Sequence, residues 1–520
     1  MANPIPKFDT ILVLDFGGQY CHLIARRVRD QRVYSEIVPC DISPNELLKI
    51  KERLTIRGII LSGGPASVYS ESAPHLDPQI LELDIPILGL CYGHQLIAHM
   101  MHGRVTRGTK REYGSTIVTI EKPFGILSGL DHAEEVWMSH YDTVYSLPKD
   151  FEVLAHTENC PVAAFRHTEK HLYGLQWHPE VSDTQHGTTV LQNFIFNICK
   201  CKANWEPSSI VEKAIGEIKR TVGEEKAIIA LSGGIDSSTA ALLASEAIGK
   251  NLIAVFVDHG FMREGEPEFV ERIFAELDVN IILIHARERF LKKIGRVTDP
   301  ERKRKIIGHE FIKVFEEIAE ERGAKYLIQG TIYPDRIESG IKKHSETIKS
   351  HHNVAGLPTQ IKFKAIIEPL KDLYKDEVRE IAKSLCLRAE ILFRQPFPGP
   401  GLAVRIIGKI THNRLELLRK ADNIVTEEIE KNRVLKATLW QYFAVLTDTK
   451  STGVRGDSRA YGDVLAIRVV TSREAMTASF AKVPYELLEK ISTRITNELP
   501  QITRVVYDIT HKPPGTIEWE

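Results

Sequence analysis

Short apolar runs rich in β-branched residues alternate with helix-length amphipathic segments over most of this chain of 520 residues. In the first 200 residues such runs occupy positions 10–15, 33–38, 57–62 and 86–91. Alternation of strand-sized and helix-sized segments is typical of a mainly parallel sheet with helices on its faces. We therefore expect an α/β fold.

The alternation restarts after ANWEPS at 203–208, a stretch typical of a linker. New strand-sized runs at 226–231, 252–258, 280–284 and 325–329 predict a second doubly wound sheet. The segment RQPFPGPG at 394–401 can continue neither a helix nor a central strand. We expect domains at 1–205, 206–398 and 399–520: two doubly wound, mainly parallel-sheet domains followed by a small α+β C-terminal domain.

Composition restricts the partners and the compartment. Lys and Arg total 68 against 69 Asp and Glu, so a net charge of -1 offers no global basic field to nucleic acid or anionic lipid. No apolar run reaches the roughly 18 residues of a membrane helix, and the start lacks a signal-peptide pattern. Seven cysteines at scattered spacings favour neither a disulfide framework nor structural zinc. We expect a cytoplasmic protein with no nucleic-acid or membrane partner.

A cysteine stands between small residues in GLCYG at 89–93, after an apolar run and before a helical pattern. Glycines permit a tight strand-to-helix turn, and a helix N-terminus stabilises a thiolate, so Cys91 is a candidate nucleophile. The alternative is a buried structural residue, which free cysteine usually is.

Two further motifs favour the nucleophile. SGGP at 62–65 follows another strand-sized run, and its backbone NH groups, with that of Tyr92, can bind an oxyanion. QWHPE at 176–180 offers His178 as the base and Glu180 to orient the imidazole.

Together GLCYGHQ at 89–95, SGGP and HPE resemble the class I, or triad, glutamine amidotransferases over roughly the first 200 residues. The resemblance implies that Cys91 attacks the side-chain amide of glutamine, expels ammonia and leaves a glutamyl thioester that water hydrolyses. It implies oxyanion donors at Gly64 and Tyr92, and glutamine contacts at Gln95, Ser139, His140 and Asp142. Tyr141 stands where this family commonly has glycine.

The motif SGGIDSS at 232–238 follows a strand-sized run and opens a helical pattern rich in Ala and Leu. Glycines let backbone NH groups approach phosphate closely, hydroxyls add donors, and the helix N-terminus supplies a positive field. A serine-capped Gly-Gly turn explains the glycines but not Asp236, a natural ligand for Mg²⁺ near phosphate.

SGGIDSS resembles the signature of the N-type ATP pyrophosphatases, which cleave ATP to AMP and pyrophosphate while adenylating a substrate oxygen. The resemblance implies ATP as co-substrate, Mg²⁺ on Asp236, and ATP contacts at Ser232, Gly233, Gly234, Asp236, Ser237 and Ser238. It also places Val257 beside the nucleotide. Lys375 is predicted to contact the pyrophosphate, with a solvated helix lysine as the alternative.

Four more segments closely resemble the family of glutamine-hydrolysing GMP synthetases: GTIYPD at 330–335, IKSHHN at 348–353, QPFPGPG at 395–401 and KPPGTIEWE at 512–520. The resemblance then covers essentially the whole chain. It implies that xanthosine monophosphate (XMP) is adenylated at its C2 oxygen and aminated to GMP, releasing AMP, pyrophosphate and glutamate. It also implies a homodimer through the C-terminal domain. The suggested XMP contacts are Arg304, Asp457, Arg459, Lys512 and Glu518, with a surface ion pair as the alternative for each.

Two other hypotheses stay open at this point. The same chemistry can serve another acceptor, as in an NAD synthetase-like or tRNA-modifying enzyme, although near-neutral charge counts against tRNA. A non-catalytic nucleotide sensor is the second, but it has no need of a nucleophile with its base. The polar segment near His351 and His352, with Ala355 where the family usually has glycine, predicts a mobile lid.

Overall fold

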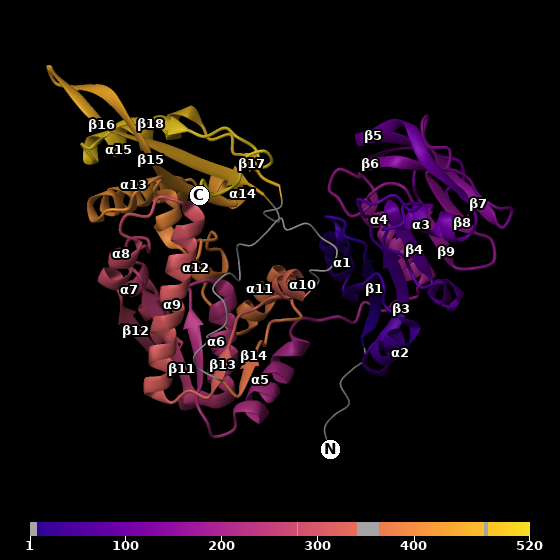
Figure 1. The fold of residues 1–520 in the computed structure, drawn as a ribbon, viewed down its shortest axis with the longest axis horizontal. Coiled ribbons are helices and arrows are strands. Elements are labelled where there is room, and N and C mark those ends of the chain that lie inside the picture. The colour runs from indigo at the N-terminus through magenta and orange to yellow at the C-terminus, as the bar shows by residue number, and fades with distance from the viewer. Residues whose placement is uncertain (1–7, 278, 341–362, 473–476) are drawn as a thin grey trace. The chain divides into compact units, whose positions relative to one another are not determined.

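The computed structural model describes residues 8–277, 279–340, 363–472 and 477–520 (Figure 1). The segment predicted as a lid, with His351, His352 and Ala355, lies outside the described residues. The chain divides into two compact units, with the main boundary between Glu206 and Pro207. Among the described helices, none is both long and apolar enough to cross a membrane.

The first unit is built on a nine-stranded mixed sheet in the order β2-β1-β3-β4-β9-β8-β7-β5-β6. Its parallel half comprises β1 Asp9–Asp15, β2 Tyr34–Pro39, β3 Thr55–Leu61, β4 Ile87–Leu90 and β9 Leu172–Leu175. Its antiparallel half comprises β5 Arg104–Ile120, β6 Ala133–Ser146, β7 Phe151–His156 and β8 Ala164–His167. The helices are α1 Cys21–Asp30, α2 Pro44–Arg53, α3 Tyr92–Met100 and α4 Gly187–Gln192, followed by a π-helical turn at Asn193–Ile198.

The parallel half of this sheet positions the first site. The central strand residues Leu12 and Leu14, with Ile60 on the next strand, are fully buried, as expected of a sheet covered on both faces. Because β1, β3 and β4 are parallel neighbours, their carboxyl ends bring the turn after Asp15, the 62–65 segment and Cys91 to one edge. The expected α/β class is confirmed, and the sheet is mixed.

The second unit begins with a five-stranded parallel sheet in the order β12-β11-β10-β13-β14. Its strands are β10 Ala227–Leu231, β11 Leu252–Asp258, β12 Ile281–His285, β13 Tyr326–Ile328 and β14 Ala365–Ile367. Its helices are α5 Ser209–Val222, α6 Ile235–Ile248, α7 Glu266–Glu276, α8 Arg287–Ile294, α9 Pro300–Arg322, α11 Lys375–Ser384 and α12 Ala389–Leu392. Helix α10 Tyr333–Gly340 begins in this unit, and its residues from Arg336 onward belong to the first unit. The strand order reverses at β10, and ligands bind at the carboxyl ends beside such a switch point.

The remainder of this unit is α+β. A sheet of β15 Gln441–Arg455, β16 Ser458–Thr471, β17 Ser479–Phe480 and β18 Ile502–Tyr507 packs with α13 His412–Lys431, α14 Arg433–Thr438 and α15 Tyr485–Glu498. One hydrophobic core runs through both parts, from Val255 and Phe290 to Leu418 and Ile467. Residues on both sides of the expected boundary at 398 thus share a core, and that boundary stays a prediction.

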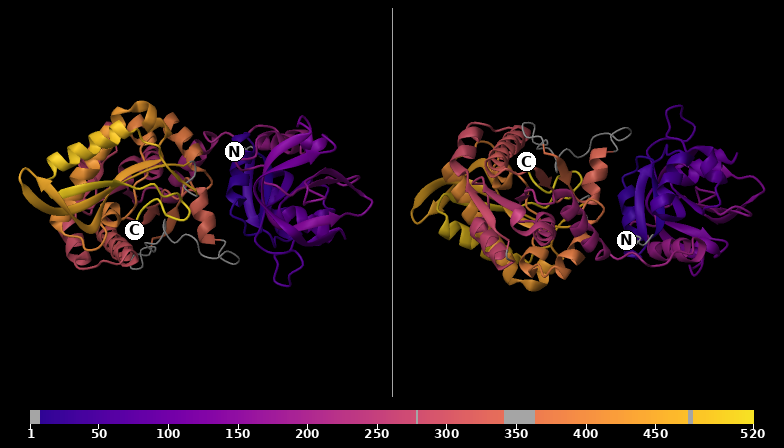
Figure 2. Two further views of the ribbon diagram at one scale, coloured as in Figure 1. Left: turned by 90° about the horizontal axis from the view of Figure 1, so that it is seen from above. Right: turned by 90° about the horizontal axis from the view of Figure 1, so that it is seen from below.

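The hairpin of β15 and β16 extends to the pair Arg455 and Ser458. Its tip projects beyond the rest of the second unit in Figure 1 and in both views of Figure 2. About 3.3 Å per residue along β16 puts Arg459 roughly 40 Å from Thr471 at the other end.

Candidate active sites

Cys91 sits on a strained turn between β4 and α3. Its backbone has φ +50° and ψ −100°, a conformation that non-glycine residues rarely adopt and that clusters at functional sites. The turn requires its flanking glycines, because a Cβ on Gly89 would lie 2.4 Å from the Gly93 oxygen and a Cβ on Gly93 would lie 2.5 Å from the Leu61 oxygen. Close packing of the turn therefore fixes the sulfur at the helix N-terminus.

His178 and Glu180 complete a buried triad with Cys91. The His178 Nδ1 lies 2.6 Å from Glu180 Oε1, and Glu180 is fully buried. Burial lowers the pKa of His178, but the Glu180 carboxylate and a hydrogen bond with the Cys91 side chain raise it by more. The net result is a pKa of about 10. An imidazolium against the sulfur is the arrangement in which cysteine acts as a nucleophile.

The expected oxyanion donors lie on the two turns around the sulfur. Tyr92 is the first residue of α3, so its backbone NH has no acceptor within the helix. A Cβ on Gly63 would lie 3.2 Å from His178 Cε1 and 3.6 Å from Cys91 Cβ, so this turn passes directly beside the triad. A Cβ on Gly64 would lie 2.6 Å from the Phe16 oxygen, and only glycine permits that approach.

The backbone of strand β6 contacts the same site. Ser139 O lies 3.6 Å from Cys91 Sγ, and the Asp142 oxygen accepts a 2.8 Å hydrogen bond from Gln95 Nε2. The Gln95 side chain is buried and also donates to Gln176 Oε1 at 3.1 Å. Gln95 thus ties α3 to β6.

Two side chains of the expected glutamine set form hydrogen bonds with other groups of the protein. His140 Nε2 lies 2.9 Å from Glu112 Oε2, and its Nδ1 lies 3.0 Å from the Asp142 oxygen. The Asp142 carboxylate accepts a 2.9 Å hydrogen bond from the Tyr69 hydroxyl. Their assignment as glutamine contacts stays a prediction, because both side chains already have partners in the protein.

Among the residues near the triad, Tyr20 belongs to none of the sequence motifs. The Tyr20 ring packs edge-on against His178 with centroids 4.9 Å apart, and the Ser62 hydroxyl accepts the Phe16 NH at 3.0 Å. Glu112, His140 and Cys160 place ligand-type atoms within 4.8 Å of one another. Both His140 nitrogens are hydrogen-bonded, so we describe this trio as a polar network that supports β6.

The 232–238 segment forms a turn with two glycines at the carboxyl end of β10. Gly233 has φ +72°, and Ser232 Oγ lies 3.0 Å from Ser237 Oγ. The first residues of α6 follow at once, and their NH groups have no acceptor within the helix. The Ser238 hydroxyl instead donates to the Gly234 oxygen at 2.7 Å, and this side chain is buried.

Asp236 and Lys375 meet at this turn. Lys375, the first residue of α11, places its Nζ 3.5 Å from Asp236 Oδ2, and the two side chains are 38% and 27% exposed. Asp236 Oδ1 is buried and has no hydrogen-bond partner among the described residues. An orphaned carboxylate oxygen beside a phosphate-type turn fits a divalent cation. The Val257 side chain is buried within β11.

The expected XMP contacts fall into two groups. Arg304 on α9 hydrogen-bonds the Glu520 backbone oxygen, and Glu518 is held by Arg405 at 2.9 and 3.0 Å. Lys512 forms a β-bridge with Ala478 at the far end of the C-terminal sheet.

Asp457 and Arg459 lie at the exposed tip of the β15–β16 hairpin. That tip is roughly 40 Å along the strand from the Ala478 end. Within one chain the structure does not bring them to Lys512.

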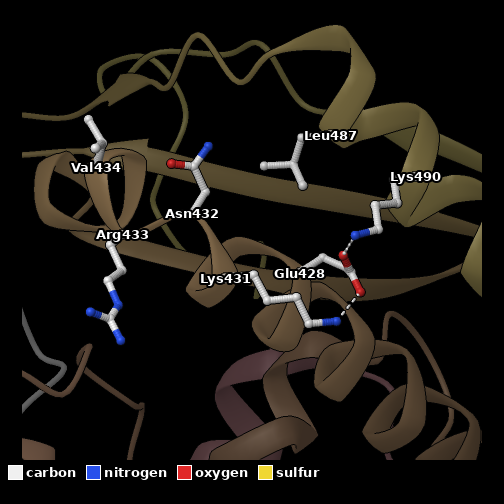
Figure 3. A pocket seen from close by; sticks show the side chains of 7 residues that line it. All are labelled: Glu428, Lys431, Asn432, Arg433, Val434, Leu487 and Lys490. Carbon is white, nitrogen blue, oxygen red and sulfur yellow. Dashed lines mark hydrogen bonds and ion pairs between the residues drawn. The ribbon is translucent and has the colours of Figure 1, made fainter.

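A hollow of about 470 Å³ lies between α13, α14 and α15 (Figure 3). Glu428 lies in the wall of the hollow. Burial raises the pKa of Glu428, but Lys431, Lys490 and Arg494 lower it by more, so that the net result is a pKa of about 2. Lys431 and Lys490 are paired to Glu428 at 2.6 and 2.7 Å. The hollow is lined by none of the candidate catalytic residues.

Comparison with known proteins assigns each part of the chain. The class-I glutamine amidotransferase family matches residues 12–198, the PP-loop domain matches 207–388 and the GMP synthase C-terminal domain matches 427–519. A glutamine-hydrolysing GMP synthase of Caldicellulosiruptor saccharolyticus is 54% identical over 516 residues, 99% of this chain and 100% of that protein. One of Caldanaerobacter subterraneus subsp. tengcongensis is 53% identical over 520 residues, 99% of each chain. One of Clostridium botulinum is 51% identical over 514 residues, 98% of this chain and 99% of that protein.

Proposed function

We propose roles for individual residues on the premise that this chain belongs to the family of glutamine-hydrolysing GMP synthases, as its full-length similarity establishes. The chain is a carbon–nitrogen ligase that aminates XMP to GMP with glutamine as the nitrogen donor and ATP as co-substrate. The residue-level proposal rests above all on the buried triad of Cys91, His178 and Glu180.

In the first unit, we assign the nucleophile to Cys91. Its sulfur attacks the side-chain amide carbon of glutamine, and the backbone NH groups of Gly64 and Tyr92 bind the oxygen that becomes negative. His178 gives a proton to the leaving ammonia and then takes one from the water that hydrolyses the thioester. Glu180 keeps the imidazole in place through its 2.6 Å contact with Nδ1.

In the second unit, we assign the 232–238 turn to the β- and γ-phosphates of ATP. Its glycines and the N-terminus of α6 supply backbone donors, and Lys375 supplies a cation. The XMP C2 oxygen attacks the α-phosphorus, pyrophosphate leaves, and ammonia then displaces AMP from C2. Asp236 would hold Mg²⁺, which neutralises phosphate charge when bound.

We also propose that two copies of the chain associate through the C-terminal sheet. Large apolar side chains lie exposed there: Val454 and Tyr461 on the hairpin, Tyr485 on α15, and Val506 and Ile509 at and after β18. Their exposed fractions run from 40% to 86%, more than isolated surface residues require.

A second copy also offers a way to reconcile the two groups of expected XMP contacts. Asp457 and Arg459 are too far along β16 to reach Lys512 in the same chain. If both groups contact one XMP, the hairpin has to reach the site of another copy. Sedimentation tests the dimer, and mixing an Arg459→Ala chain with a Lys512→Ala chain tests sharing. Shared sites predict that mixed dimers regain activity in one of their two sites.

We place the protein in the cytoplasm because all seven cysteines are free thiols. A reporter fused to the chain would show its compartment directly.

The experiment that tests the central proposal measures pyrophosphate release from ATP and Mg²⁺ with XMP, supplying glutamine or ammonium chloride, and identifies the purine product. GMP from both nitrogen sources is expected. Glutamine hydrolysis without turnover of XMP would point to another acceptor, and loss of both reactions would favour a nucleotide sensor.

A further inference from the structure

The phosphate turn at 232–238 contains one charged side chain, Asp236, and that side chain is acidic. The β- and γ-phosphates of ATP, and the pyrophosphate that leaves, carry several negative charges. Backbone NH groups supply only partial positive charge, so full cations have to come from elsewhere in the fold. Lys375 is one, and it approaches from the Asp236 side.

A second cation lies against the turn at Gly233. An ideal Cβ on Gly233 would lie 3.3 Å from Arg394 Nη1 and 3.1 Å from Glu266 Oε1. Arg394 follows α12 by two residues, far from the turn in sequence, and Glu266 is the first residue of α7. The bare backbone of Gly233 is what permits this arginine to come so close.

The Arg394 guanidinium is held from two directions. Its Nη2 forms an ion pair with Glu266, whose side chain is 3% exposed, and its plane lies over the Phe269 ring at 4.6 Å. Arg394 itself is 20% exposed, so it is ordered by protein contacts yet reachable from solvent. A planar, pre-oriented fork of donors is the geometry that binds phosphate oxygens in pairs.

We propose that Arg394 is a further substrate contact of the adenylating site: it binds the β- and γ-phosphates of ATP, and then pyrophosphate, at Gly233, while Lys375 approaches at Asp236. Glu266 and Phe269 are its positioning residues. The inference rests on the proposed role of the 232–238 turn. It adds a second cationic side chain for the phosphates, and this residue lies outside the SGGIDSS motif.

A purely structural role is the competing explanation, because the ion pair also joins the 389–394 region to α7. A second ion pair joins the same two segments of the fold. Arg388 joins Glu276 at 2.6 Å, again between the segment at α12 and α7. Glu276 lies ten residues along α7 from Glu266, a rise of roughly 15 Å. Arg388→Ala is therefore the control for Arg394→Ala.

The test titrates the full-length protein with inorganic pyrophosphate and Mg²⁺, and separately with AMP, by calorimetry. Arg394→Ala is expected to weaken pyrophosphate binding by about 10- to 100-fold, the effect of one charge-assisted phosphate contact. AMP affinity should stay within about twofold, because AMP lacks the β- and γ-phosphates. Arg388→Ala should leave both affinities unchanged.

Arg394→Lys is a second variant that tests the inference if the alanine variant does not fold. It keeps the charge but not the fork, and we expect pyrophosphate binding to weaken by about 3- to 10-fold. The kinetic counterpart, with ammonium chloride as nitrogen source, is a raised KM for ATP while glutamine hydrolysis by the first unit is unchanged.

Three results would overturn the inference: pyrophosphate binding equal to that of the unmodified protein, an equal loss in Arg388→Ala, or an equal loss for AMP and pyrophosphate. If the unmodified protein itself failed to bind pyrophosphate, the proposed role of the turn would fall as well. Failure of the arginine alone and failure of the turn are thus distinguishable.

Discussion

The two candidate sites share one piece of local architecture and use it in opposite ways. Each is a glycine-containing turn from the carboxyl end of a parallel strand into a helix. The Cys91 turn is buried and strained, with His178 and Glu180 already in contact beside it, whereas the Asp236 side chain at the other turn is 27% exposed. The first is organised without a ligand, and the second has polar groups that a ligand would complete.

This difference follows from the chemistry that each turn is proposed to perform. A cysteine nucleophile needs a base and an oxyanion site held in advance within a dry pocket. A nucleotide site has to admit and release a large, highly charged molecule, so its cations come from separate elements. Closed geometry suits the covalent step, and open geometry suits exchange of phosphate.

The largest effect that separates the two sites is expected from Cys91→Ala. Glutamine-dependent GMP formation should fall by about 10³-fold or more, because no nucleophile remains, while ammonia-dependent formation is retained. Parallel assays with glutamine and with ammonium chloride measure this ratio. Equal activity with glutamine before and after the change would remove Cys91 from its assigned role.

Asp236→Asn should show the reverse pattern. Loss of the carboxylate charge at the phosphate turn is expected to lower turnover about 10²-fold with either nitrogen source, leaving glutamine hydrolysis intact. Raising the Mg²⁺ concentration should recover part of the activity if Asp236 holds the ion. Retained turnover at low Mg²⁺ would contradict that assignment.

The strain of the closed turn can be tested without chemistry. Gly93→Ala should destabilise the first unit by about 3 kcal/mol, because the new Cβ meets the Leu61 backbone oxygen at 2.5 Å. Gly323→Ala, at the left-handed end of α9, is the control: φ is +71° and ψ is +34° there, but nothing lies within 4 Å of the Cβ position, so about 1 kcal/mol is expected. Denaturant unfolding compares the two, and similar costs would show that close packing of the elbow is unimportant.

The smallest expected effects are in the pH dependence of two buried histidines. The pKa of His178 is raised to about 10 despite burial, so its stabilising contribution is complete below about pH 6.5 and is lost as pH rises through about 10. Burial lowers the pKa of His94 to about 3, so that residue disfavours the folded state as pH falls below 6.5. NMR of labelled histidine should find His178 protonated and His94 neutral at pH 7. A neutral His178 at that pH would break the contrast.

Much of both sites was open to prediction because their signals are local. A strand, a glycine turn and a helix follow one another within about ten residues, so the α/β class and the place of Cys91 and of the 232–238 turn could be inferred directly. The residue-by-residue roles assigned to these motifs remain to be measured. Within β6, by contrast, the sequence could not tell that Ser139 approaches the sulfur through its backbone while His140 faces Glu112.

What the amino-acid sequence determined by itself is therefore the chemistry of short segments: two glycine turns, a nucleophile, a base with its carboxylate, and a carboxylate suited to a cation. Only the tertiary structure decided which distant groups stand beside them. It sets Lys375 beside Asp236 and Arg394 beside Gly233 at the phosphate turn, and it separates Asp457 and Arg459 from Lys512 along a strand. Short motifs depend on backbone geometry over a few bonds, whereas neighbours across the fold depend on sheet order and on the packing of a shared core.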